Sequence, residues 1–233
     1  TAACIAFSQA LGVSTLCITE HAFQLYFDKK PAMSFKWQDD PARVEQVWAS
    51  PKRHRMADYR RFAEKIRSPF VRIGLEVDLF DNGRLLLAPE DAEGCDILVG
   101  AIHAIQGFVP GVTPQQEAEA LFIRDVERLV EHPIAVLAHP FRFFQRNKLE
   151  VPKRLFPAVA QLLADGNVAA EVNFHTNRPD PEFIRICVEK GVKIALASDT
   201  HELGELGEFW PHVNVLRQAG ITPKMFPDVL FSF

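Results

Sequence analysis

The sequence lacks the features that mark secreted, membrane-bound and nucleic-acid-binding proteins. Its 233 residues include four cysteines, and no two of them form a CxxC pair. No apolar run is long enough to cross a bilayer, and no charged-then-apolar leader opens the chain. These absences predict a cytoplasmic protein without a membrane partner, whose cysteines are small buried side chains in a reducing compartment.

An excess of positive charge is also absent. Lys and Arg number 26 against 30 Asp and Glu, the formal net charge is -4, and the pI is about 6.1. Proteins that bind nucleic acid through its phosphates usually carry a basic surface, so this balance disfavours such a partner while leaving a local basic patch open. The sequence leaves the oligomeric state undetermined.

Hydrophobic residues make up 48% of the chain, enough for one large core. Six apolar runs do not alternate with polar residues, which is typical of parallel strands buried on both faces. They span residues 14–19, 71–79, 96–102, 135–138, 169–173 and 193–197. Helical patterns lie between them, at 2–11, 41–66 (one or two helices, interrupted at Pro51), 114–131 (with Thr113 as N-cap), 155–164 and 181–190.

Six repeats of strand and helix favour an α/β barrel that forms a single domain over residues 1–233. Six strands are fewer than the usual eight. The chain opens at Thr1, inside an expected helix, so we expect preceding residues that include a further N-terminal strand.

Metal-capable side chains lie at or near the C-terminal end of every predicted strand. In chain order these are Glu20 and His21, Glu76 and Asp78, His103, His139, Glu171 with Asn173 and His175, and Asp199 with His201. Active sites of such barrels lie at the C-terminal ends of the strands. Imidazole and carboxylate ligands suit Zn, Mn or Fe better than Ca. We therefore expect a metal site formed by His21, Glu76, His103, His139, Asp199 and His201.

Other residues near these ends are candidates for different roles. Arg142 and Arg178 could bind a phosphate group, although both also fit a description as surface arginines. His175 is equally consistent with a pocket and with a loop. His132 precedes a strand, at the opposite end of the barrel, and is expected to be structural.

Five segments, in order, resemble motifs of the PHP (polymerase and histidinol phosphatase) domain family. They are 18–21 (Ile-Thr-Glu-His), 74–76 (Gly-Leu-Glu), 100–103 (Gly-Ala-Ile-His), 138–140 (Ala-His-Pro) and 198–201 (Ser-Asp-Thr-His). Each motif is weak alone, and five in the right order are specific.

The resemblance implies a distorted (β/α)7 TIM-like barrel that binds two or three divalent ions (Zn, Mn or Fe). By the resemblance, Glu76 and Asp199 would bind the first ion. Glu76, His103 and His139 would bind the second ion, and His21 and His201 the third. A metal-activated hydroxide would attack phosphorus, with Glu76, Asp199 and His201 as catalytic residues.

Two departures from the family pattern bear on the site. The family has Asp where this chain has Glu20. The family also begins with a strand bearing His-x-His, which would precede Thr1. Without that strand we expect weak metal binding and an open barrel seam with exposed strand edges.

The leading functional hypothesis is hydrolysis of a small phosphomonoester. A nuclease or phosphodiesterase acting on nucleic acid or nucleotides is the alternative, and the acidic pI counts against it. A third hypothesis is a degenerate PHP domain without activity, which the retained ligands at the strand ends disfavour.

Overall fold

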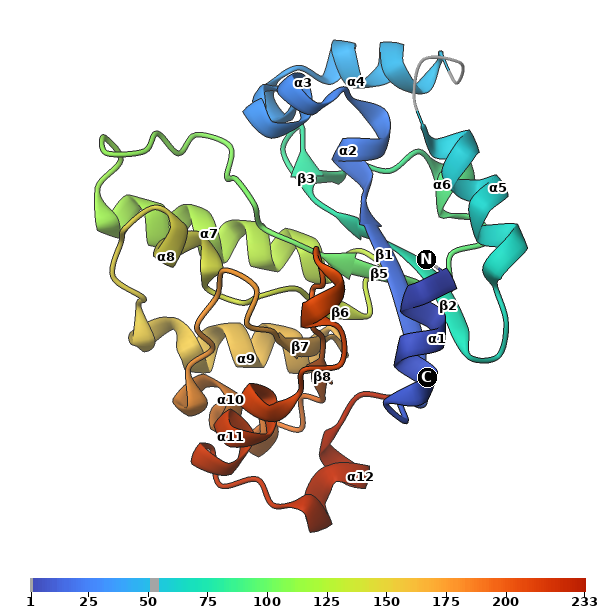
Figure 1. Ribbon diagram of the computed structural model, residues 1–233. Coiled ribbons are helices and arrows are strands. Elements are labelled where there is room, and N and C mark those ends of the chain that lie inside the picture. The colour runs from blue at the N-terminus through green and yellow to red at the C-terminus, as the bar shows by residue number, and fades with distance from the viewer. Residues whose placement is uncertain (1, 51–54) are drawn as a thin grey trace.

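The computed structural model describes residues 2–50 and 55–233, and its centre is a curled sheet of six parallel strands (Figure 1). The strand order is β1-β2-β5-β6-β7-β8. The strands are β1 Leu16–His21, β2 Val71–Val77, β5 Ile97–Gly100, β6 Val136–Leu137, β7 Ala169–Val172 and β8 Ile194–Leu196. All six predicted strands are confirmed. Chain order matches sheet order, as in a partial TIM-like barrel, while a seven-stranded barrel stays a prediction.

Helices surround the curled sheet. The α-helices are α1 Ala2–Ala10, α2 Ala22–Tyr26, α3 Lys29–Ser34, α4 Pro41–Trp48, α5 Met56–Ile66, α6 Pro89–Ala92, α7 Gln115–Val130, α8 Arg142–Arg146, α9 Phe156–Asp165, α10 Pro181–Glu189, α11 Trp210–Gln218 and α12 Phe226–Val229. Short 3-10 helices are η1 Lys36–Asp39, η3 Lys153–Leu155, η4 Leu203–Glu205 and η5 Pro223–Met225. In Figure 1, α7, α9 and α10 follow one another at the left of the sheet, and α5 lies at the right near β2.

The predicted helices are confirmed to within two residues at each end. Segment 41–66 forms two helices, and Pro51, the expected break, lies outside the described residues. The predicted N-cap of α7 is wrong. Pro114 takes that position, and the Thr113 hydroxyl instead accepts a hydrogen bond from the Val109 amide at 2.8 Å. The Thr113 hydroxyl therefore closes the loop before α7 and does not cap the helix.

Two apolar clusters hold the barrel together. The larger one lies between the sheet and its helices, and a smaller one fills the inside of the curl with Ile97, Val99 and Val136 among its members. Phe231 packs against the inner cluster, and its amide donates to the Ile194 carbonyl at 2.8 Å. The C-terminal segment therefore covers part of the β8 edge.

The cysteine prediction is right for Cys187 only, because Cys4, Cys17 and Cys95 are half-buried. All four are free thiols. Among the described residues, no helix combines the length and apolarity that a membrane span requires.

A close approach of two strands explains the glycine in segment 74–76. A Cβ at Gly74 would lie 2.4 Å from both the carbonyl oxygen and the Cγ2 of Ile97 on β5. The Gly74 carbonyl also accepts a hydrogen bond from the Tyr59 hydroxyl of α5 at 2.6 Å. Gly74 therefore sets the spacing of β2 and β5, two residues before Glu76.

We expect Gly74→Ala to lower the free energy of unfolding by about 1–3 kcal/mol, because the added methyl must push two paired strands apart. Urea unfolding of the purified variant measures this. Gly204→Ala is the matched control, since an added Cβ there meets nothing within 4 Å. Equal stability of the two variants would contradict the proposed strand contact.

Candidate metal centre

The parallel register brings side chains from distant parts of the chain to one edge of the sheet. His21, the last residue of β1, pairs with Glu76 near the end of β2. His103 follows β5 and His139 follows β6. Because parallel strands end at the same edge, these four side chains meet although they lie far apart in sequence.

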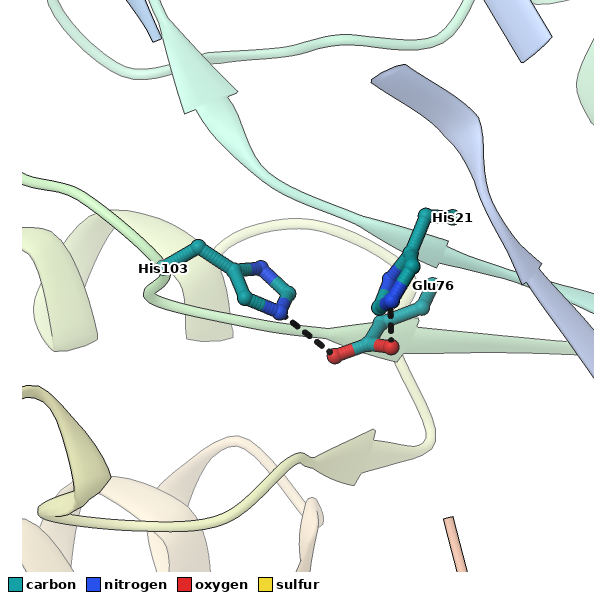
Figure 2. Close-up of side chains that lie close together, drawn as sticks. All are labelled: His21, Glu76 and His103. Atoms are coloured by element: carbon teal, nitrogen blue, oxygen red, sulfur yellow. Dashed lines mark ion pairs between the residues drawn. The ribbon is translucent and has the colours of Figure 1, made fainter. Parts of the chain in front are cut away.

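The Glu76 carboxylate is the point on which the imidazoles converge. His21 Nδ1 lies 2.9 Å from Glu76 Oε2, and His103 Nε2 lies 3.5 Å from Oε1 (Figure 2). His139 Nε2 contacts Oε1 from a third side at 2.9 Å. The side chains of Glu76, His103 and His139 are buried, at 7%, 4% and 2% exposure. The cluster is therefore shielded from bulk water.

The protonation of these groups follows from burial and from their mutual contacts. Burial would raise the pKa of Glu76, but His103, His139 and His21 together hold it well below its ordinary value. Burial lowers the pKa of His139 to about 3, despite its contact with Glu76. Burial would also lower the pKa of His21, yet Glu76, Asp78 and Asp199 raise it. Glu76 is thus an anion, and His139 beside it is a neutral imidazole. These are the protonation states in which carboxylates and imidazoles bind a cation.

Arg142 and Asp199 complete the buried cluster. One guanidinium nitrogen of Arg142 lies 3.1 Å from Asp199 Oδ2, and another lies 2.9 Å from His103 Nε2 and also contacts His139 Nε2. The Arg142 side chain is 4% exposed, so it lies among the predicted ligands and not on an open rim. Burial and the charge of Glu76 raise the pKa of Asp199, against the effect of Arg142.

A second donor group lies beside the first. Donor atoms of His175, His201 and Glu205 lie within 4.8 Å of one another. The two imidazoles stack with centroids 4.1 Å apart and an interplanar angle of 14°, so the ring planes are nearly parallel. The His201 ring is 5.9 Å from that of His21 and is 47% exposed. A shared ion of His21 and His201 therefore stays a prediction.

Sequence reasoning assigned no role to three acidic residues of this region. Asp78, 1% exposed, lies 3.0 Å from His103 Nδ1 and accepts a hydrogen bond from its amide at 3.1 Å. Glu171 accepts a hydrogen bond from the His139 amide at 2.6 Å. The strand-end rule already lists Asp78 and Glu171 among the metal-capable side chains, but it gives neither of them a role. Glu205 lies beyond every predicted strand, and no sequence signal marks it.

The remaining residues considered from the sequence lie outside the cluster around Glu76. His132 Nε2 lies 2.7 Å from the Gly83 carbonyl, at the end where β6 begins. Arg178 is exposed, and its backbone is fixed by the Gln145 side chain at 3.0 Å. Phe141 and Phe144 are buried and pack against the ring of Phe122.

The donor set fits a divalent cation of the zinc or manganese type. Two ligands of a tetrahedral ion with bonds of about 2.0–2.1 Å lie about 3.3 Å apart. The separations of His21 Nδ1 and His103 Nε2 from the Glu76 oxygens, 2.9 and 3.5 Å, bracket that value. Asp78 orients the far nitrogen of His103, as carboxylates commonly do for metal-bound imidazoles.

Glu76→Gln should reduce bound metal by more than about tenfold, because it removes the charge on which the imidazoles converge. Elemental analysis after dialysis against limiting zinc or manganese measures this. Glu119→Gln is the matched control. Glu119 of α7 is also buried, but it pairs with Arg154 of η3 and not with the imidazoles of the site. Metal content that is unchanged in Glu76→Gln would contradict the site.

Comparison with known proteins gives one family match. The sequence profile of the PHP domain matches residues 2–175, which is most of the chain and includes β1 to β7. The comparison with curated proteins finds no match.

Proposed function

The chain belongs to the PHP domain family, and from this membership we propose that it is a metal-dependent hydrolase that cleaves a small phosphomonoester. The family generally comprises metal-dependent hydrolases. One observation carries the proposal for this chain: imidazoles from the ends of β1, β5 and β6 converge on the buried carboxylate of Glu76. We take residues 1–233 to be a single PHP-type domain.

We assign two or three divalent ions (zinc, manganese or iron) to the cluster. The proposed ligands are His21, Glu76, His103, His139, Asp199 and His201. Such ions, when bound, supply Lewis acidity to phosphoryl oxygens and lower the pKa of a coordinated water.

The proposed catalytic residues Glu76, Asp199 and His201 differ in how they reach the reacting atoms. Glu76 and Asp199 are largely shielded, so their charges act at close range in a low dielectric. His201 Nδ1 lies 2.8 Å from the Asp199 carbonyl oxygen, which leaves Nε2 as the nitrogen that would hold an ion. Because this ring is half-exposed, an ion held there would be open to solvent and to substrate.

Phosphate binding is proposed for Arg142, His175 and Arg178. A phosphomonoester carries up to two negative charges, and a guanidinium can hold two of its oxygens at once. Arg142 is the best supported of the three, because its guanidinium lies 3.1 Å from Asp199 and 2.9 Å from His103. It can therefore exchange these contacts for a phosphoryl group within the cluster.

We expect His139→Ala to reduce phosphate release by more than about 100-fold, because it removes a proposed ligand that contacts Glu76. The assay is a panel of phosphomonoesters with manganese or zinc. His132→Ala, at the opposite end of β6, should stay within about twofold of the unmodified protein.

Circular dichroism of both variants separates loss of the site from loss of the fold. Equal effects of the two substitutions would count against the assignment. Cleavage of single-stranded DNA or a dinucleotide, with phosphomonoesters ignored, would favour the nuclease alternative.

A further inference from the structure

The turn after β6 holds two non-glycine residues in left-handed conformation. His139 has φ of 32° and Phe141 has φ of 69°. Side chains disfavour this region, and such residues persist only where their surroundings fix them. The turn carries His139 and, one residue after Phe141, the start of α8 at Arg142. Contacts with neighbouring residues must therefore fix both His139 and Phe141 in this turn.

An aromatic cluster holds the Phe141 end. The Phe141 ring packs edge-to-face on Phe156 and Phe183, with centroids 4.8 and 5.0 Å away. The residue is only 3% exposed. This packing fixes the Phe141 side chain and leaves the His139 end to be fixed separately.

A polar clamp from β7 holds the His139 end. The His139 amide donates to Glu171 Oε2 at 2.6 Å. The Asn173 side-chain amide donates to the same oxygen, and Asn173 is fully buried. Asn173 is in turn tied to Asn177, whose side-chain amide donates to the Asn173 carbonyl at 3.3 Å. Asn173 thus holds the Glu171 carboxylate, which accepts the hydrogen bond from the His139 amide.

Both functional groups of the turn depend on this conformation. His139 Nε2 lies 2.9 Å from Glu76 Oε1. The Arg142 amide donates to the His139 carbonyl at 3.0 Å, which fixes the start of α8 and with it the guanidinium beside Asp199. A change of φ at His139 would swing the imidazole away from Glu76 and shift Arg142 with it.

We propose that Glu171 is a positioning residue, which holds the His139 turn in its left-handed conformation and so sets the imidazole for metal binding. The inference rests on the proposed function, because it takes His139 as a ligand. Glu171 acts through the His139 backbone, whereas Asp78 acts on the His103 ring itself. A carboxylate serving only general stability would not affect ligand geometry.

Two substitutions at position 171 test the role of the oxygen that accepts the His139 hydrogen bond. Glu171→Gln keeps an oxygen for the His139 amide, and Glu171→Ala removes it. Glu189→Ala is the control, since Glu189 is exposed and pairs with Arg185 one helical turn away. Amide hydrogen exchange of His139, followed by NMR in metal-free protein, reports the clamp. Cobalt titration, followed by the visible absorption of the bound ion, reports the ligand geometry.

We expect Glu171→Ala to speed His139 exchange by at least about tenfold and to weaken cobalt binding by about 10–100-fold. Glu171→Gln should restore both to within about threefold of the unmodified protein, and Glu189→Ala should change neither. Unchanged His139 exchange in Glu171→Ala would overturn the clamp.

Two further outcomes separate this inference from the proposed function. Faster exchange with unchanged cobalt affinity would overturn the positioning role while leaving the metal site intact. An unmodified protein that binds no cobalt would contradict the proposed function, and the exchange measurement would still decide the clamp.

Discussion

The contact between the Glu76 carboxylate and three imidazoles is the interaction on which the rest of the site depends. It exists because the sheet is parallel and in register, so that His21 pairs with Glu76 across β1 and β2. Gly74 allows β2 and β5 to approach closely, which brings the His103 strand end within reach of the same carboxylate. The fold thus supplies the site through strand spacing together with the segments that follow β5 and β6.

Placing several carboxyl groups in this buried space has an electrostatic cost. Burial, with the charges of Asp199 and Glu76, raises the pKa of Glu171 to about 8. Burial and Glu76 raise the pKa of Asp199 as well. Arg142 is the guanidinium that contacts the cluster, and its own pKa is lowered by burial. Divalent cations would offset the remaining repulsion, which is the physical reason that the donor set suits metal binding.

The sequence predicts those parts of this arrangement that local patterns encode. Apolar runs identify all six strands, and the rule that sites lie at strand ends identifies His103 and His139 as neighbours. It does not predict the β3 Leu79–Phe80 and β4 Arg84–Leu85 hairpin, because residue 79 continues the apolar run of β2. It also does not show that Arg142 is buried among the proposed ligands, or that Glu171 fixes the His139 amide. These features depend on contacts between strands distant in sequence.

The anomalous-scattering map of a crystal grown with manganese or zinc tests the central claim most directly. The account predicts at least one peak bonded to Glu76 and to two or more of the imidazoles of His21, His103 and His139, at about 2.0–2.2 Å. Coordinates that hold these side chains apart, or a map whose peaks lie only at His175, His201 and Glu205, would contradict it.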